Sequence, residues 1–125
     1  MKSKSYRDLL VWQKSIALCI KVYKICELFP KSELYGLAGQ MKRASVSVPS
    51  NVAEGQARRH IGEFLQFLSI ASGSLAELDT QRVVAERLTF ISGDCSGDLE
   101  RDITEVQKML YSLDDKLKLA KRTKN

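Results

Sequence analysis

Apolar residues recur at alternating spacings of three and four along most of the chain, and this spacing places them on one face of an α-helix. The clearest seam lies near the carboxyl end and comprises Leu99, Ile103, Val106, Leu110, Leu113, Leu117 and Ala120. It predicts a helix over about 96–121 that packs nearly parallel to its neighbours, as in a helical bundle.

Three more helices are expected from the same pattern. The first spans about 8–29, and its seam comprises Leu9, Trp12, Ile16, Cys19, Tyr23 and Cys26, broadened by Leu10, Ala17 and Ile20. So broad a face predicts burial on two sides, in a bundle or at a subunit contact. Further helices are expected over about 33–57, with Ser32 as N-cap, and over about 61–90, followed by a loop at 92–97 that is rich in serine and glycine.

The chain is organised around residues 40–59, QMKRASVSVPSNVAEGQARR. A proline inside a helix removes one backbone hydrogen bond and usually kinks the helix, so a kink is expected at Pro49. Small residues thin the middle of this helix, and Ser72, Gly73, Ser74 and Ala76 thin the middle of the next one. Two thin helices can approach closely, which predicts an antiparallel hairpin.

These elements define an all-α fold: an antiparallel up-down-up-down four-helix bundle, kinked at Pro49, in a single domain over residues 1–125. The chain has only 7 glycines and 2 prolines, which disfavours a turn-rich β fold.

Polar residues within the 40–59 stretch leave two interpretations open. Asn51 falls where an apolar residue is due, so Asn51 and Glu54 could form a buried polar network with Arg43 or with a residue of another helix, because buried polar groups must be paired. Alternatively, Asn51 and Glu54 could contact a ligand.

The charge favours an anionic partner. The formal net charge is +5 and the pI about 9.2. Residues 1–32 carry seven Lys/Arg against two acids, whereas residues 60–97 carry two against five. This asymmetry suits RNA or DNA binding, and equally suits complementary faces between subunits.

Basic side chains are the candidate binding residues. Arginine suits phosphate because its planar fork donates hydrogen bonds in pairs. Glu54 precedes Arg58 by four residues, so Arg58 could simply pair along its helix, which leaves Arg59 freer. The candidate nucleic-acid contacts are Lys42, Arg58, Arg59, Lys121 and Arg122.

No catalytic or cofactor chemistry is apparent. The one histidine, His60, stands at a helix junction, and no Glu-x-x-His pair, Cys/His cluster or glycine-rich phosphate loop occurs. We therefore expect no enzymatic activity, metal, cofactor or small-molecule substrate. The three cysteines fit no disulfide framework, and no apolar run approaches a membrane span, so a cytoplasmic protein without membrane association is expected.

Three stretches together resemble a known family: YRDLLVWQKS, FPKSELYGLAGQMKRASVSVPSNVAEG and EFLQFLSIASGSLAELDTQ. They are similar to four-helix-bundle proteins encoded within intervening sequences of bacterial 23S ribosomal RNA genes, to which accessory proteins of diversity-generating retroelements are related. The resemblance covers about residues 6–115. Matching motif positions include Gln40, Arg43, Ser47, Pro49, Asn51, Glu54 and Gly55, with Gly73, Ser74, Glu77 and Gln81 on the next helix.

The resemblance implies a ring-like homo-oligomer, a pentamer, with a basic surface that binds RNA and with no enzymatic activity. One position departs from the family pattern: His60 stands where a serine N-cap is common, so the capping box with Glu63 is incomplete. Two functions are therefore carried forward. One is an RNA-binding accessory factor, and the alternative is an interaction module that docks a polymerase-like protein partner without touching nucleic acid.

Overall fold

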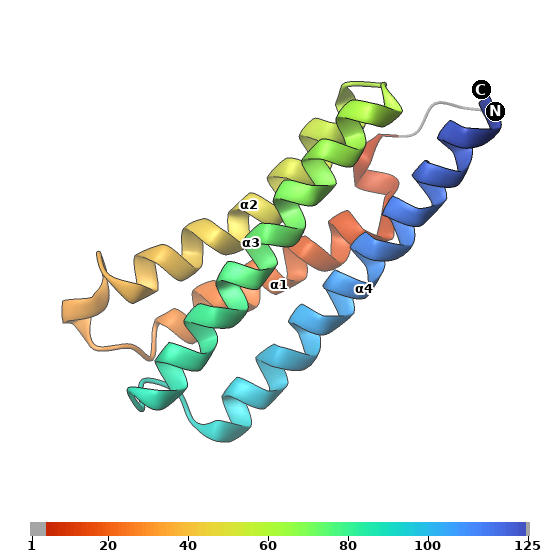
Figure 1. Cartoon of the computed structure of the whole chain (residues 1–125). Coiled ribbons are helices and arrows are strands. Elements are labelled where there is room, and N and C mark those ends of the chain that lie inside the picture. The colour runs from red at the N-terminus through yellow and green to blue at the C-terminus, as the bar shows by residue number, and fades with distance from the viewer. Residues whose placement is uncertain (1–4, 125) are drawn as a thin grey trace.

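The computed structural model describes residues 5–124, which form four α-helices and two short 3-10 helices, with no strand in this range (Figure 1). The elements are η1 (Tyr6–Asp8), α1 (Leu10–Cys26), η2 (Lys31–Glu33), α2 (Leu37–Ala57), α3 (Ile61–Arg87) and α4 (Gly93–Lys124). The all-α, four-helix prediction is confirmed.

Consecutive helices run in alternating directions (Figure 1). Among the described helices, α2 packs most extensively against α3, the neighbours α1 and α4 meet least, and the backbones of α1 and α3, like those of α2 and α4, lie diagonally across the bundle. The α2–α3 turn and the last turns of α4 therefore lie at one end of the molecule (Figure 1). Helix α2 continues through Pro49 as one element, and the kink there stays a prediction.

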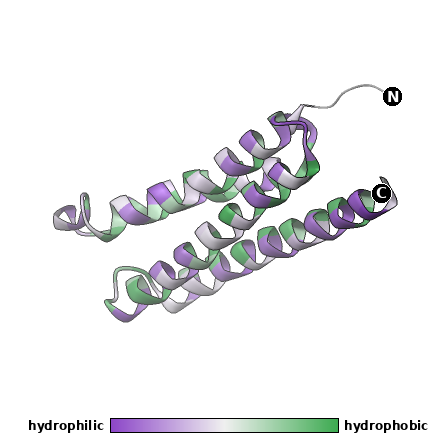
Figure 2. Ribbon diagram, turned by 45° about the horizontal axis from the view of Figure 1, so that its top comes forward, coloured by the Kyte–Doolittle hydropathy of each residue, from purple (hydrophilic) through white to green (hydrophobic). Residues whose placement is uncertain are grey.

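One apolar core joins all four helices, and hydrophobic and hydrophilic positions alternate along each of them (Figure 2). The α4 seam is buried from Leu99 to Leu110, as its spacing predicts, and its exposure increases toward the carboxyl end. The side chains that solvent does not reach at all are Val22, Met41, Val48, Val52, Ala71, Leu75, Leu78, Ala85 and Leu99.

The α1 seam predicted from sequence was wrong in part. Val11, Leu18, Val22 and Ile25 are buried, whereas Tyr23 is exposed. Of the residues that were expected to broaden the face, Ile20 is 52% exposed, and Leu10 and Ala17 are exposed as well. The cause is that α1 carries two apolar stripes, and only one of them meets the rest of the chain.

Local capping moves two helix starts from their expected places. Lys31–Glu33 forms a 3-10 turn, and the Glu33 carboxylate accepts a hydrogen bond from the Leu37 amide at 3.1 Å, so α2 begins at Leu37 and Ser32 is not its N-cap. The loop expected over 92–97 is largely helical, because the Ser92 hydroxyl accepts from the Cys95 amide at 3.1 Å and α4 starts at Gly93.

The end of α3 shows a Schellman arrangement. The Phe90 amide donates to the Ala85 carbonyl and the Thr89 amide to the Glu86 carbonyl, each at 2.9 Å. Thr89 takes the left-handed conformation (φ 63°) that usually falls to glycine in this motif. Helix α3 therefore ends at Arg87, earlier than the sequence pattern predicts.

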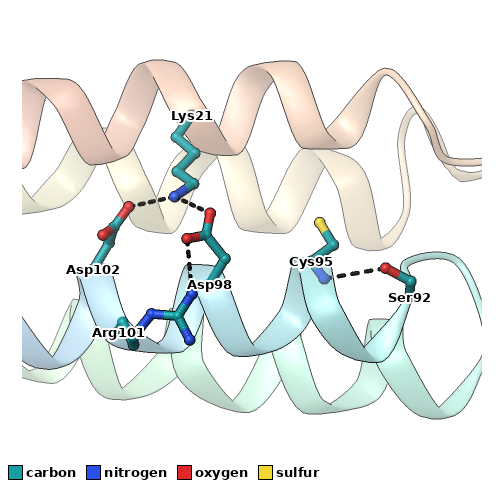
Figure 3. A network of polar contacts seen from close by, with 6 residues as sticks. All are labelled: Lys21, Ser92, Cys95, Asp98, Arg101 and Asp102. Carbon is teal, nitrogen blue, oxygen red and sulfur yellow. Dashed lines mark hydrogen bonds and ion pairs between the residues drawn. The ribbon is translucent and has the colours of Figure 1, made fainter.

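A polar bridge joins the two helices that pack least. The Lys21 ammonium on α1 lies between Asp98 and Asp102 on α4, 2.6 Å from the Asp102 carboxylate, and Arg101 pairs with Asp98 at 3.1 Å (Figure 3). The hydrogen bond from Lys21 lowers the pKa of Asp98. Burial lowers the pKa of Lys21, but hydrogen bonds to the two carboxylates outweigh it, so the net pKa is raised.

No helix within residues 5–124 has the length and apolar character needed to cross a membrane.

Helices α2 and α3 approach closely at Gly55. A Cβ at Gly55 would lie 2.7 Å from the Phe67 Cβ and 2.9 Å from the Phe64 Cδ1. The small residues in the middle of α3 contribute less to the contact with α2 than predicted. Ser74 meets Ser47, with 2.8 Å between their hydroxyl oxygens, but Gly73 and Ala76 are exposed.

Alanine substitutions at two glycines test this contact. We expect Gly55→Ala to lower the free energy of unfolding, because overpacking of about 1–3 kcal/mol exceeds the gain in helix propensity of about 1 kcal/mol. Gly73→Ala is the control: its Cβ would meet nothing within 4 Å, so it should stabilise the protein by about 0.5–1 kcal/mol. Urea denaturation measures both, and equal effects of the two substitutions would contradict the close approach.

Acid denaturation tests the bridge between α1 and α4. Since the pKa of Asp98 is lowered in the folded chain, its stabilising contribution is present above the ordinary Asp pKa of about 4 and disappears as the pH falls through the folded value. We expect Lys21→Met to flatten the fall in the free energy of unfolding below about pH 4, leaving the part due to Arg101.

The matched control is Lys14→Met, because Lys14 and Glu105 are both exposed and 3.8 Å apart. This substitution should leave the pH profile close to that of the wild type. Parallel profiles for the wild type and Lys21→Met would show that the bridge contributes nothing.

Candidate nucleic-acid interface

The turn between α2 and α3 presents a free cation. Arg58 is the C-cap of α2, and Arg59 follows in the left-handed conformation (φ 63°), its amide donating to the Gln56 carbonyl at 3.3 Å. The Arg59 side chain is exposed and forms no ion pair within the described residues. Arg59 is therefore positioned by the helix end and available to an anion.

His60 occupies the N-cap position directly before α3, but its side chain does not cap the helix. Its backbone is extended, as at an N-cap, but its side chain accepts no hydrogen bond from the first turn. Glu63, the other half of the capping box, instead pairs with Arg58 at 3.4 Å. The incomplete box predicted from the sequence is confirmed, and the first-turn amides keep the partial positive charge of a helix N-terminus.

Residues of α4 complete a cluster of cations at this end. The Lys121 ammonium lies 3.5 Å from the position that a Cβ on Gly62 would occupy, so α4 places it beside the first turn of α3. Arg122 is the next residue along α4 and is exposed. We call Arg59, His60, Lys121 and Arg122 the basic end.

A pocket of about 590 Å³ opens at the basic end. It lies where η1 approaches the α2–α3 turn, and it combines apolar and polar groups. Its lining residues are Ser5, Tyr6, Gln56, Ala57, Arg59, His60, Ile61 and Phe64. Tyr6 and Gln56 were not among the candidates from sequence, because nothing in their local spacing shows that η1 folds back onto the end of α2.

Arg58 is occupied within the fold. Its guanidinium pairs with Glu54 at 3.1 Å and with Glu63 at 3.4 Å, and it lies 5.1 Å from the centre of the Phe67 ring. The pairing along the helix that its spacing suggested is confirmed. Arg58 adds positive charge near the basic end, but two carboxylates compensate it.

Lys42 is not part of the basic end. Its ammonium lies 5.2 Å from the centre of the Tyr23 ring, between α2 and α1. Lys42 and Arg59 are seventeen positions apart along α2 and the turn that follows it, which corresponds to a rise of about 25 Å. The structure therefore places Arg59 and Lys121 at the same end of the bundle and Lys42 elsewhere.

The network expected around Asn51 does not include Arg43, but it reaches another helix through Ser47, whose hydroxyl oxygen lies 2.8 Å from that of Ser74 on α3. The Asn51 amide donates to the Ser47 carbonyl at 2.7 Å and to the Ser47 hydroxyl at 2.9 Å, one turn back on the same helix. Asn51 is half-buried, Glu54 pairs with Arg58, and Arg43 is exposed. A structural role for Asn51 is supported, whereas the buried role expected for Arg43 is contradicted.

On α3, Gln81 is buried and its amide donates to the exposed Glu77 carboxylate at 3.5 Å. The Gln81 carbonyl oxygen is buried without a hydrogen-bond partner among the residues that the structure describes. Both residues lie on a different helix from the basic end, so this part of the family motif is separate from the candidate interface.

The sequence reasoning missed the most buried cation. Arg82 is only 6% exposed, and its guanidinium meets Asp79 at 2.9 Å, Glu100 at 3.3 Å and the Ser96 hydroxyl at 2.7 Å. The acids three residues before it and four residues after it were a signal for such pairing. Arg82 links α3 to α4, and its charge is not available to an outside anion.

No group of three or more His, Cys, Asp or Glu side chains that could hold a metal ion occurs in the described part of the chain. The three cysteines are unpaired, and burial raises the pKa of the Cys26 thiol to about 11, against a smaller effect of Lys42. At the basic end, the exposed cations Arg59, Lys121 and Arg122 are suited to binding an anion because they are positively charged.

The fold and this end of it define a small all-α bundle with exposed cations at one end. A crystal structure of a protein of unknown function from the S23 ribosomal protein family of Bacteroides thetaiotaomicron VPI-5482 is similar, with a TM-score of 0.78 and 20% sequence identity. The similarity covers 83% of this chain and 97% of that one.

Residues 7–112 match the family described as 23S rRNA-intervening sequence protein, and the chain belongs to that family. No curated protein matches the chain in sequence.

Proposed function

We propose that this protein is an RNA-binding accessory factor that contacts RNA phosphates through its basic end. The observation that carries the proposal is that one end of the bundle gathers cations that have no ion pair among the described residues and that come from two separate parts of the chain: Arg59 at the α2–α3 turn, and Lys121 with Arg122 near the end of α4. The proposed role is binding, without a chemical step.

The distribution of ion pairs supports this location. Several cations elsewhere in the fold lie within 4 Å of a carboxylate, among them Lys21, Arg58, Arg82, Arg101 and Lys118. Arg59, Lys121 and Arg122 form no such pair within the described chain, so a polyanion would displace counterions there without breaking protein contacts. The family description, which refers to intervening sequences of 23S rRNA, favours RNA as that polyanion.

A second candidate function is self-assembly, favoured by the unburied stripe of α1. Ile20, and Leu28 with 68% exposure, flank a groove of about 430 Å³ that Lys21 and Lys24 also line. Lys21 already pairs with Asp98 and Asp102, so Lys24 is the cation on this face that the exposed Glu77 carboxylate on α3 would complement in another copy. We propose a homo-oligomer on these grounds; the resemblance implies a pentamer. Docking of a polymerase-like partner is the alternative use of the same face.

RNA binding across a salt series tests the proposed interface. We expect labelled single-stranded RNA to bind with an affinity that falls steeply with salt, and Arg59→Gly/Lys121→Ala to weaken binding. The slope of log affinity against log salt should decrease by about 1.4, because each lost phosphate contact removes about 0.7. Glycine is chosen at Arg59 because φ is 63° there and alanine would remain strained. Fluorescence anisotropy measures both quantities.

The matched control is Lys31→Ala/Arg87→Ala, which removes the same charge from exposed residues at the other end of the bundle. An equal loss in both double variants would show that net charge alone binds RNA. Absence of binding by the wild type at physiological salt would refute the proposal.

Light scattering tests self-assembly through α1. The wild type should be oligomeric at micromolar concentration, and Ile20→Asp should yield a monomer, because a buried unpaired carboxylate costs several kcal/mol. Leu119→Asp is the control, since Leu119 is similarly exposed on α4. A monomeric wild type would contradict the proposal, and a loss of assembly in both variants would place the interface elsewhere.

A further inference from the structure

We infer that the pocket at the basic end receives one unpaired base of a single-stranded RNA while the basic end holds the adjoining phosphates. The inference rests on the proposed function and narrows its substrate to RNA with an accessible base. Three observations support it. Aromatic and cationic side chains line the pocket, the Tyr6 ring is fixed by its neighbours, and a duplex has no unpaired base to offer.

The lining of the pocket combines the groups that a nucleotide requires. Tyr6, Ile61 and Phe64 supply aromatic and apolar surface, each of them half-buried rather than sealed in the core. Arg59 and His60 line the same pocket and are exposed. Its volume of about 590 Å³ is that of a typical small-ligand site. Aromatic surface beside a free guanidinium fits a flat heterocycle joined to a phosphate.

Tyr6 is held in place before any ligand arrives. It begins η1, and its ring centre lies 5.4 Å from that of Trp12, with the planes inclined by 59°. The Arg7 guanidinium lies 5.9 Å from the Tyr6 ring centre. The Ser5 hydroxyl caps η1 by accepting from the Arg7 amide at 3.0 Å. A fixed aromatic ring loses little conformational entropy when a base stacks on it.

A cationic surface alone would not distinguish single strands from duplexes, because both present phosphates. The pocket adds a site for an unpaired base, so it favours single strands over duplexes. Bases in an A-form duplex are stacked and paired, whereas unpaired bases can be splayed out onto aromatic side chains. Stacking is also nearly independent of salt, in contrast to phosphate contacts, so the two contributions can be separated experimentally.

The test compares a uridine-rich single-stranded RNA with the same strand annealed to its complement. The variant is Tyr6→Leu, which keeps an apolar side chain against Trp12 but has no aromatic face. We expect Tyr6→Leu to weaken single-strand binding about tenfold at every salt concentration, with an unchanged salt slope, and to leave duplex binding unaltered. Tyr6→Phe should restore wild-type affinity.

The fluorescence of Trp12, the one tryptophan in the chain, supplies a second readout because it lies beside Tyr6. Its emission should change in a saturable manner with the single strand and not with the duplex. Tyr35→Leu is the control, since Tyr35 is 92% exposed near the start of α2, far from the pocket. Thermal unfolding of each variant establishes that it is folded.

The outcomes separate the two proposals. If Tyr6→Leu binds the single strand as tightly as Tyr35→Leu, or weakens single strand and duplex alike, the base pocket is refuted. Salt-dependent binding lost in Arg59→Gly/Lys121→Ala would then still support the basic end. If the wild type binds neither RNA, both proposals fail together.

Discussion

The close approach of α2 and α3 at Gly55 is the constraint on which the rest of the structure depends. Only a residue without a Cβ fits there, because Phe64 and Phe67 of α3 occupy the space that a side chain would need. Gly55 lies two residues before the end of α2, so this contact is directly beside the place where the chain turns back. Arg58 pairs across the turn with Glu63, whereas Arg59 is exposed and has no carboxylate partner among the described residues.

Ion pairing, rather than net charge, determines which surface can attract a polyanion. Lys21 and Arg82 connect α4 to α1 and to α3, and their charges are used within the fold. The cations near the α2–α3 turn that have no carboxylate partner in the described part of the chain come from residues more than 60 positions apart in the sequence. The net charge of +5 counts paired and unpaired cations alike, so it cannot locate such a surface. In an assembly of several copies, each copy would contribute one such end.

The candidate site was predictable only in part. Arg59 was identified as free because Glu54 precedes Arg58 at a pairing distance along the helix, and that argument needs only local spacing. Lys121 and Arg122 were identified by their charge, but their position beside Gly62 follows from how α4 packs. Lys42 looked equivalent to them and lies elsewhere, against Tyr23. The role of Tyr6 depends on the folding back of η1, for which no periodic pattern exists.

The sequence by itself determined the helical class, the number of helices and the α4 seam. A strict apolar repeat places all apolar side chains on one face of the helix, and only that face can be buried in the core. The sequence could not choose between the two apolar stripes of α1, since periodicity records that a face is apolar and not which neighbour covers it. Tertiary packing decided the helix ends, the partners of Asn51 and Arg82, and the position of Lys121 beside Gly62. These depend on distances between elements, and residue spacing along one helix contains no information about them.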